Sequence, residues 1–412
     1  MTTKIDTDVV VVGGGIGGLG SALALTRAGV RVRVLEQATE FGEVGAGLQM
    51  APNATRILRS WGLLERVVAR GVVPQRLAMR DAVDGQELTH LDLADVERRY
   101  GAPYVVIHRS DLHAILLEAC REAGVELVTD AAVTGVELGP DRAVALGDGR
   151  HDGGRIVLAA DGLGSRLRRR LSADEPVSSA YVAYRGAVPL EDLPDTGGLA
   201  LHEVVVYVGP HCHLVQYPLR RGEMFNQVAV FRSPRALAGE EDWGTPDELD
   251  TAFADTCEAV RSALPNLWRD RWWRMYDREP IDGWVDGRLA LTGDAAHPML
   301  QYLAQGACQA LEDADCLAAQ VGKQAGAEQL DRNTLDRDTL DRDTLDCDTI
   351  DWDTALRDYA DVRTARTARV QRTARAWGDL WHCDGLFRSV RNAMLRDREP
   401  TDYRYVDWLY GV

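Results

Sequence analysis

A histidine and a tyrosine recur on one side of an apolar stretch near the middle of the chain. Residues 209–219 read GPHCHLVQYPL. Side chains on a strand alternate between two faces, so His211, His213, Val215 and Tyr217 would share one face. An imidazole can take or give a proton near neutral pH, and a phenol can donate a hydrogen bond. This face suits a pocket that moves a proton, and the competing interpretation is a core histidine satisfied by its neighbours.

The run His211-Cys212-His213 also has the residue types of a metal site. The other Cys and His residues supply no matching second pair of ligands, so we predict no metal. The chain holds seven cysteines and no CxxC pair. An odd, dispersed set of thiols is typical of a reducing compartment, and we expect a cytoplasmic protein.

A second candidate site lies in residues 8–36, DVVVVGGGIGGLGSALALTRAGVRVRVLE. The pattern predicts a buried strand, a helix and a second strand, with Gly13-x-Gly15-x-x-Gly18 at the first turn. In such a unit Gly13 makes the tight turn, Gly15 lets the backbone approach a pyrophosphate, and Gly18 lets the helix pack on the sheet. The helix N-terminus favours the negative charge. Glu36 ends the second strand, where its carboxylate can accept hydrogen bonds from a ribose, so the unit predicts a dinucleotide site.

The elements that must position these residues are of two kinds. The pattern of residues 8–36 is typical of a parallel sheet. The later β-rich runs differ from it, because turn signals separate EVVVYVG, HCHLVQYPL and MFNQVAVF. These runs predict an antiparallel meander and hence a second domain over about residues 178–276. The chain then returns to the first kind, with a short strand over Leu289–Thr292 that ends at Gly293-Asp294 and a helix that begins near Gly306.

The composition limits the function classes. The chain has 412 residues, of which 45% are apolar and 27% charged, which is typical of a globular protein. Acidic residues outnumber basic ones by 64 to 47, and the net charge of −17 disfavours nucleic acid, whose phosphates need a basic footprint. No apolar run approaches the ~20 residues of a membrane span. The first strand begins at Val9, so we expect no secretory signal.

Residues 330–354 form a tandem repeat, LDRNT, LDRDT, LDRDT, LDCDT and IDWDT. A period of five puts the apolar residues on no single face of a helix or a strand. The repeat therefore predicts an acidic, mobile surface insertion that buries little, because a β-solenoid would need more repeats to bury a core. The helical stretch after it carries an arginine at every third position, either as a solvated face or as a contact with anionic lipid or with the chain's own acidic surface. These arginines are Arg363, Arg366, Arg369 and Arg372.

Three motifs, in this order, resemble the single-component flavoprotein aromatic hydroxylases. The first is the glycine fingerprint with Glu36, and the second is LAADGLGSRLR (158–168), centred on Asp161-Gly162. The third is LTGDAAHPMLQYLAQGACQALEDA, centred on Gly293-Asp294. The resemblance covers nearly the whole chain. It is strongest to the members that hydroxylate 3-hydroxybenzoate, through segments such as EFGEVGAGLQMAPNATRIL, GAPYVVIHRSDLH and DRWWRMYDREPI.

The resemblance implies an α/β fold, in which a Rossmann-like FAD-binding domain carries an inserted antiparallel-sheet substrate domain and is followed by C-terminal helices. The implied FAD-binding domain is discontinuous, with residues 1–75, 101–177 and 277–329. Residues 76–100 and 178–276 form the substrate-binding sheet domain, 330–354 the acidic insertion and 355–412 the C-terminal helical region.

The resemblance also implies the cofactors and the residues that bind them. NADH and molecular oxygen are the implied co-substrates, and NADH is expected to bind transiently because the chain has one nucleotide fingerprint. A small aromatic acid is the implied partner, while a second copy of the chain in a homodimer and an anionic lipid surface stay open. The implied FAD-binding residues are Gly13, Gly15, Ile16, Gly18, Glu36, Gln49, Arg109, Asp161, Asp294, Gly306 and Ala307.

The implied reaction converts 3-hydroxybenzoate into 2,5-dihydroxybenzoate (gentisate), through a flavin C4a-hydroperoxide that attacks an electron-rich ring. A phenolate is richer in electrons than a phenol, so a base is required, and the resemblance places His213 in that role. Tyr104, Tyr217 and Gln301 are implied to line the substrate pocket. The alternatives are a salicylate-type decarboxylating hydroxylation and hydroxylation of another substituted phenol. A flavin halogenase would carry a Trp-x-Trp-x-Ile-Pro motif, which the sequence lacks, and an FAD-binding sensor would need no base.

Overall fold

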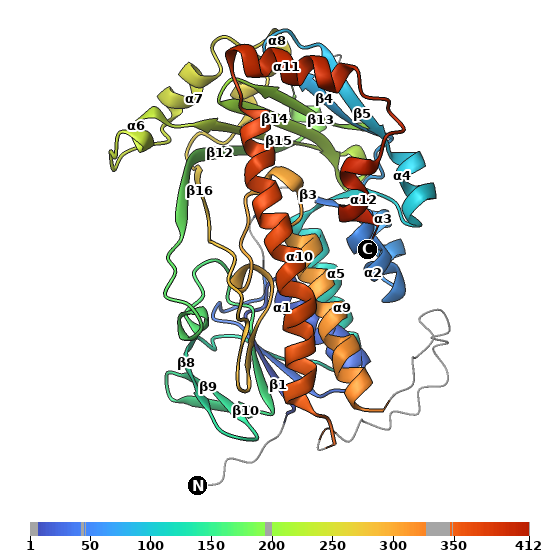
Figure 1. Cartoon of the computed structure of the whole chain (residues 1–412), viewed down its shortest axis with the longest axis vertical. Helices are drawn as coiled ribbons and strands as arrows, with labels where there is room; N and C mark the ends of the chain where they lie inside the picture. Colours follow the sequence, from blue (N-terminus) through green and yellow to red (C-terminus); the bar gives the residue numbers. More distant parts are fainter. Residues whose placement is uncertain are drawn as a thin grey trace.

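The structure is a computed structural model that describes residues 7–42, 45, 47–193, 200–326, 347 and 349–411. Figure 1 shows two sheet regions at opposite ends of the longest axis, with the long helix α10 (Trp352–Trp381) running between them. This arrangement is the mixed α/β fold that the sequence predicts.

The first region is built on a six-stranded sheet of order β17-β18-β11-β1-β2-β7. Its strands pair in parallel except β17 with β18. The four valines of β1 are all buried, as expected of a strand in a parallel sheet. Helix α1 packs against α5 and α9. The strands are β1 (Val9–Val12), β2 (Val32–Leu35), β7 (Glu126–Val128), β11 (Ile156–Ala159), β17 (Val285–Asp286) and β18 (Leu289–Leu291). The helices are α1 (Ile16–Arg27), α5 (Arg109–Ala123) and α9 (Gly306–Gln324).

The second region is a seven-stranded sheet of order β16-β12-β15-β14-β13-β4-β5. Its centre, β13-β14-β15, is the predicted antiparallel meander, and only β13 and β4 pair in parallel. Two separate stretches of chain therefore build this sheet. Its strands are β4 (Arg76–Asp81), β5 (Glu87–Asp92), β12 (Val177–Pro189), β13 (Glu203–Gly209), β14 (Cys212–Leu219), β15 (Met224–Arg232) and β16 (Trp273–Asp277).

Smaller elements complete the described fold. The pair β3 (Gly47–Met50) and β6 (Val105–His108) is antiparallel, as is the sheet of β8 (Val133–Leu138), β9 (Ala143–Gly147) and β10 (Arg150–Gly154). The shorter helices are α2 (Pro52–Ser60), α3 (Leu64–Arg70), α4 (Leu93–Tyr100), α6 (Pro234–Leu237), α7 (Pro246–Ala252) and α8 (Glu258–Arg261). After α10 come α11 (Gly385–Arg396) and α12 (Arg404–Tyr410).

The end of the tandem repeat corrects one prediction. Residues 330–346 and 348 lie outside the described residues, but Cys347, Ile350 and Trp352 are buried in the main core, with 7%, 6% and 3% exposure. Helix α10 begins at Trp352, where the Asp351 carboxylate caps the backbone N–H of Thr354. A period of five leaves the apolar residues without a common face only where the chain keeps one regular conformation throughout. A turn into a helix breaks that period, so apolar residues without a common face still reach the core.

The arginine series on α10 also differs from a uniform surface stripe. Arg363 is 3% exposed and pairs with Glu312 and Asp313 of α9. Arg366 pairs with Glu312, while Arg369 lies over the ring of Trp408, 4.1 Å from its centroid. The series therefore passes from the interior to the surface, and its first two members pair with the chain's own acidic residues.

Candidate active site

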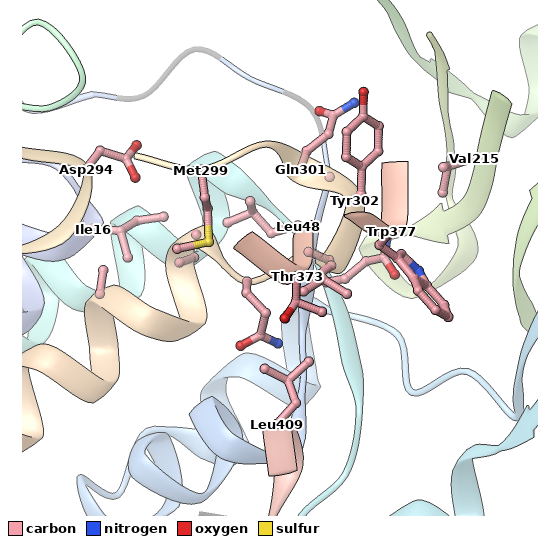
Figure 2. A pocket seen from close by; sticks show the side chains of 18 of the residues that line it. Ile16, Leu48, Val215, Asp294, Met299, Gln301, Tyr302, Thr373, Trp377 and Leu409 are labelled. Atoms are coloured by element: carbon pink, nitrogen blue, oxygen red, sulfur yellow. The ribbon is translucent and has the colours of Figure 1, made fainter. Parts of the chain in front are cut away.

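A cavity of about 1280 Å³ lies between the two sheet regions. This volume exceeds the about 300–1,000 Å³ of a usual small-molecule site, so the cavity has room for a cofactor together with a substrate. Figure 2 shows Ile16 and Asp294 on one side of it, Val215 of the second sheet on the other, and Met299 and Gln301 between them.

The glycine loop at the start of α1 forms one end of the cavity. Gly13 has a φ of +109°, and a Cβ there would meet the carbonyl oxygen of Ala160 at 2.4 Å. A Cβ on Gly18 would meet the carbonyl oxygen of Gly13 at 1.9 Å, so Gly18 serves helix packing and does not line the cavity. The N-cap Gly15 gives α1 no side-chain cap. A helix N-terminus left open to a cavity fits the pyrophosphate of a dinucleotide.

Glu36 closes the same end of the cavity. Its carboxylate accepts hydrogen bonds from the backbone N–H groups of Gly14 (2.7 Å) and Ala38 (2.9 Å). These bonds fix the carboxylate at the edge of the glycine loop, where a ribose hydroxyl can reach it. The residues present therefore fit the adenosine half of FAD.

The other predicted cofactor residues lie around the cavity with one difference. Ile16, Gln49, Arg109, Asp294, Gly306 and Ala307 line it, from elements distant in the sequence. Asp161 also lines it, but its carboxylate accepts hydrogen bonds from the Ser165 hydroxyl (2.6 Å) and the Arg166 N–H (2.9 Å). Asp161 thus shapes its own turn.

The second sheet supplies the opposite wall through one face of its central strands. The register pairs His213 with Val230 of β15, and Val215 with Val228. His213 is 1% exposed, and its burial lowers its pKa to about 3, so the ring is neutral. Its Nδ1 lies 2.7 Å from Nε2 of His382, at the end of α10. This contact leaves Nε2 of His213 as the ring nitrogen available to a ligand.

Two buried tyrosines stand near this wall. The Tyr104 hydroxyl donates to Oε1 of Gln49 at 2.8 Å, while Tyr217 presses against the backbone of Gly47, where a Cβ would lie 2.4 Å from the ring. Burial raises the pKa of both hydroxyls, which are therefore neutral donors. Gln301, in a 3₁₀ turn (Gln301–Leu303), accepts a 3.4 Å hydrogen bond from Arg185. The structure thus brings all four predicted pocket residues to one cavity.

Several lining residues carry no sequence motif and were missed. Arg185 of β12 is one, and the single signal for it was a charged residue within the β-rich run YVAYRGAVP. His382, the partner of His213, lies 169 residues further along the chain. The C-terminal helices also contribute to the wall through Thr373, Trp377, Trp408, Leu409 and Tyr410.

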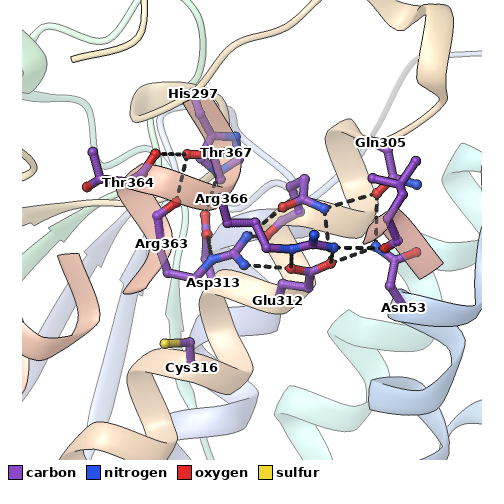
Figure 3. A network of polar contacts seen from close by, with 12 residues as sticks. Asn53, His297, Gln305, Glu312, Asp313, Cys316, Arg363, Thr364, Arg366 and Thr367 are labelled. Carbon is purple, nitrogen blue, oxygen red and sulfur yellow. Dashed lines mark hydrogen bonds and ion pairs between the residues drawn. The ribbon is translucent and has the colours of Figure 1, made fainter. Parts of the chain in front are cut away.

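A buried network of charges holds the loops of the cavity (Figure 3). Arg363 donates to Asp313 at 2.7 Å and to Glu312 at 2.5 Å. Asp313 accepts hydrogen bonds from the N–H of Gly293 (2.9 Å) and from His297 (2.6 Å). Burial raises the pKa of Asp313, but His297, Arg363 and the Gly293 N–H outweigh it and hold the pKa at about 2. Arg366 donates to the carbonyls of Trp408 and Leu409, which line the cavity. The network therefore ties the Gly293-Asp294 loop to the C-terminal wall.

Comparisons with known proteins agree with this geometry. Residues 6–347 match the sequence family described as "FAD binding domain". The chain is 38% identical over 413 residues to 3-hydroxybenzoate 6-hydroxylase 1 of Aquipseudomonas alcaligenes, covering 98% of this chain and 97% of the relative. Among solved structures it is similar to Klebsiella pneumoniae HpxO complexed with FAD and uric acid, with 25% identity, a TM-score of 0.79 and coverage of 98% and 96%. It is also similar to a salicylate hydroxylase substrate complex, with 26% identity, a TM-score of 0.76 and coverage of 100% and 96%.

The described residues hold neither a helix that could span a membrane nor a cluster of metal ligands. None of their helices combines the length and apolarity that crossing a bilayer requires. None of their His, Cys, Asp and Glu side chains gather in groups of three or more that could hold a metal ion.

Proposed function

This chain belongs to the FAD binding domain family and is a flavoprotein aromatic hydroxylase, and from this premise we propose that it converts 3-hydroxybenzoate into 2,5-dihydroxybenzoate. In the proposed reaction 3-hydroxybenzoate, NADH, O₂ and a proton give 2,5-dihydroxybenzoate, NAD⁺ and water. One oxygen atom forms a new hydroxyl group on the ring carbon para to the existing hydroxyl, the hydrogen of that carbon leaves as a proton, and the other oxygen atom leaves as water. NADH supplies the two electrons.

The observation that carries the proposal is the neutral His213 at the wall of the cavity that also holds the glycine loop. The loop Gly13–Gly17, Glu36 and the N-termini of α1 and α9 would hold FAD. Bound FAD, once reduced, supplies the activated oxygen that is transferred to the ring. The protein must hold the substrate ring close to the bound FAD and must make that ring electron-rich. This requires a base beside the phenol to remove its proton.

The hydrogen bond between the two histidines defines how the base works. If Nε2 of His213 takes the phenolic proton, its Nδ1 carries a hydrogen and donates it to Nε2 of His382, 2.7 Å away. The positive charge formed on His213 then faces the new phenolate and is shared with His382. This sharing matters because burial disfavours the imidazolium of both rings by lowering their pKa.

NADH as the reductant and a cytoplasmic location are parts of the proposal. The sequence has one nucleotide fingerprint, which FAD would occupy, so the nicotinamide cofactor would bind transiently and leave. All seven cysteines are free thiols, which suits a reducing compartment. A homodimer stays a prediction from the sequence.

The proposed reaction is tested with the FAD-loaded protein. NADH oxidation is measured with and without 3-hydroxybenzoate, and the product is identified by NMR. We expect oxidation to be strongly stimulated by substrate, with one 2,5-dihydroxybenzoate formed per NADH. Fast oxidation without substrate, accompanied by stoichiometric hydrogen peroxide, would contradict coupled hydroxylation.

A salicylate-type decarboxylating hydroxylation is the second candidate, favoured by the likeness to the salicylate hydroxylase complex. It would release CO₂ and give catechol from 2-hydroxybenzoate, whereas the main proposal retains the carboxylate. Product analysis with both acids separates the two reactions.

A further inference from the structure

Arg185 places a positive charge in the apolar wall of the cavity. The register of the second sheet aligns it with Val228 of β15, Val215 of β14 and Val206 of β13. All four residues line the cavity. The guanidinium therefore belongs to the same face as His213, and it stands among branched aliphatic side chains.

Among the residues that the structure describes, no carboxylate pairs with Arg185. One Nη donates to Oε1 of Gln301 at a long 3.4 Å, and the guanidinium lies 5.4 Å from the centroid of the Trp273 ring. Its Nε is buried and has no hydrogen-bond partner. Burial lowers the pKa of Arg185, which is the direction expected for a cation that lacks a counter-ion.

The four deeply buried arginines of the described residues all pair with carboxylates, whereas Arg185 is partly exposed to the cavity and its Nε is fully enclosed. Arg168 and Arg278 contact Asp174 at 2.9 Å and 3.3 Å. Arg363 contacts Glu312 and Asp313, and Arg391 contacts Asp81 at 3.4 Å. A buried charge without a partner costs stability, because desolvation is not offset by attraction. Arg185 has no such pairing and lines a cavity, so a ligand can supply the anion.

We propose that Arg185 binds the carboxylate of the aromatic substrate and so fixes the ring between itself and His213. The proposal rests on the proposed function for the identity of the ring, and it adds the residue that selects an acid over a neutral phenol. A planar guanidinium binds a carboxylate through two parallel hydrogen bonds, which fixes direction as well as position. The substrate carboxylate would also replace Gln301 as the hydrogen-bond partner of Arg185. The Gln301 side-chain amide could then bind the substrate.

The spacing of the sheet agrees with this placement. Arg185 stands two strands from Val215, and His213 precedes Val215 by two residues. With about 4.8 Å between strands and about 3.3 Å per residue, the Cα atoms of Arg185 and His213 lie about 12 Å apart. Because both side chains line the cavity from the same face of the sheet, one ring can lie over the valines between them, with its carboxylate toward Arg185 and its hydroxyl toward His213.

The experiment measures ligand binding to the FAD-loaded protein by calorimetry, under anaerobic conditions without NADH. The ligands are 3-hydroxybenzoate and the neutral 3-hydroxybenzamide. The variants are Arg185→Met, Arg185→Lys and the matched control Arg274→Met. Arg274 also stacks on a tryptophan, 4.4 Å from the centroid of Trp243, but it does not line the cavity. FAD content and Tm are measured for every variant.

Arg185→Met is expected to weaken 3-hydroxybenzoate binding by about 10- to 100-fold, the range for lost charge-assisted hydrogen bonds, and amide binding by less than about threefold. Arg185→Lys keeps the positive charge but loses the pair of parallel N–H donors, so we expect an intermediate loss of affinity for 3-hydroxybenzoate. FAD content should be unchanged. Tm without ligand should be equal or slightly higher in Arg185→Met, because a partly buried charge without a counter-ion is removed. Arg274→Met should keep the wild-type preference for the acid.

Three results with the Arg185→Met variant would overturn the proposal: equal losses of affinity for acid and amide, loss of FAD, or a marked fall in Tm. Loss of FAD would show that Arg185 is needed for cofactor binding, and a marked fall in Tm would show that it stabilises the fold. If wild type binds benzoates through Arg185 but forms no hydroxylated product, the proposed function fails and the anion site stands. If wild type binds the amide as tightly as the acid, the anion site fails, whatever reaction is catalysed.

Discussion

At the scale of single residues, a buried pair of neutral histidines carries the proposed proton transfer. His382 accepts a hydrogen bond from His213 in the proposed tautomer, and its ring stacks on Tyr181 with 4.5 Å between centroids. His382 does not line the cavity, so it acts through His213 as a positioning residue. The contact resembles the way a carboxylate orients a catalytic histidine, with a neutral ring in place of the charge.

His382→Leu is expected to lower product formation about tenfold, because the proton taken by His213 is no longer shared. FAD binding and substrate-triggered NADH oxidation should stay close to wild type, so hydrogen peroxide should account for the missing product. His382→Gln retains an oxygen that can accept from Nδ1, and it should recover part of the coupling. The ratio of product to NADH is the measurement. Equal ratios in wild type and His382→Leu would remove His382 from the mechanism.

At the scale of elements, one carboxylate holds α11 on the second sheet. Asp81, at the end of β4, is fully buried. It accepts hydrogen bonds from Arg388 at 2.7 Å and from Asn392 at 2.6 Å, and it lies 3.4 Å from Arg391. These partners, with the backbone N–H of Val83, outweigh burial and hold the pKa of Asp81 at about 2.

The lowered pKa of Asp81 determines how the stability of the fold changes with pH. A carboxyl whose pKa is lower in the folded state stabilises the fold above its unfolded pKa, and this stability is lost as pH falls toward the folded pKa. Asp81→Asn should therefore lower the free energy of unfolding by about 3 kcal/mol at pH 7. The difference in Tm from wild type should shrink between pH 5 and about 2.5 as Asp81 in wild type becomes protonated.

Asp84→Asn is the matched control, since Asp84 forms a 3.8 Å pair with Arg396 in which both side chains are 41% exposed. Such surface pairs contribute little, so Tm should barely change. A Tm difference between wild type and Asp81→Asn that is the same at every pH would contradict the assignment.

The elements also show what the sequence could and could not predict. The glycine loop, the meander and the Gly293-Asp294 loop follow from local chemistry: turns that require glycine, β-rich runs, and an acid after a strand. Arg185 and His382 could not be predicted in the same way. Their roles depend on the register of β12 and on the place where α10 ends, both of which are set by packing between segments far apart in the chain.

At the scale of the whole molecule, the acidic repeat interrupts the chain between α9 and α10. The buried Ile350 and Trp352 show that its last residues belong to the core, while the period argument for the preceding pentapeptides rests on the sequence. A deletion should therefore be tolerated only if it stops before these residues.

Two deletions test this boundary. Replacing residues 331–345 by a short Gly/Ser linker should leave FAD content and activity near wild type. Replacing residues 331–354 removes Ile350 and Trp352 and the start of α10, so it should lower Tm by several degrees, since burying each large apolar side chain contributes about 1.5–3 kcal/mol. Similar Tm values for the two deletions would show that the last pentapeptide is dispensable. A large loss in the shorter one would assign a structural role to the repeat.

The central claim is that His213 removes the phenolic proton during a coupled hydroxylation. The most direct test measures oxygen, hydrogen peroxide and 2,5-dihydroxybenzoate together, across pH, for wild type, His213→Ala and the control His211→Ala. His211 lies on the same stretch of chain but does not line the cavity. In His213→Ala we expect FAD and NADH oxidation to persist, product to fall by about 10²- to 10⁴-fold, and peroxide to replace it. Product should rise again at high pH, where solvent ionises the phenol, and His211→Ala should stay coupled. If His213→Ala forms product as efficiently as wild type at neutral pH, His213 is a core histidine and the central claim is wrong.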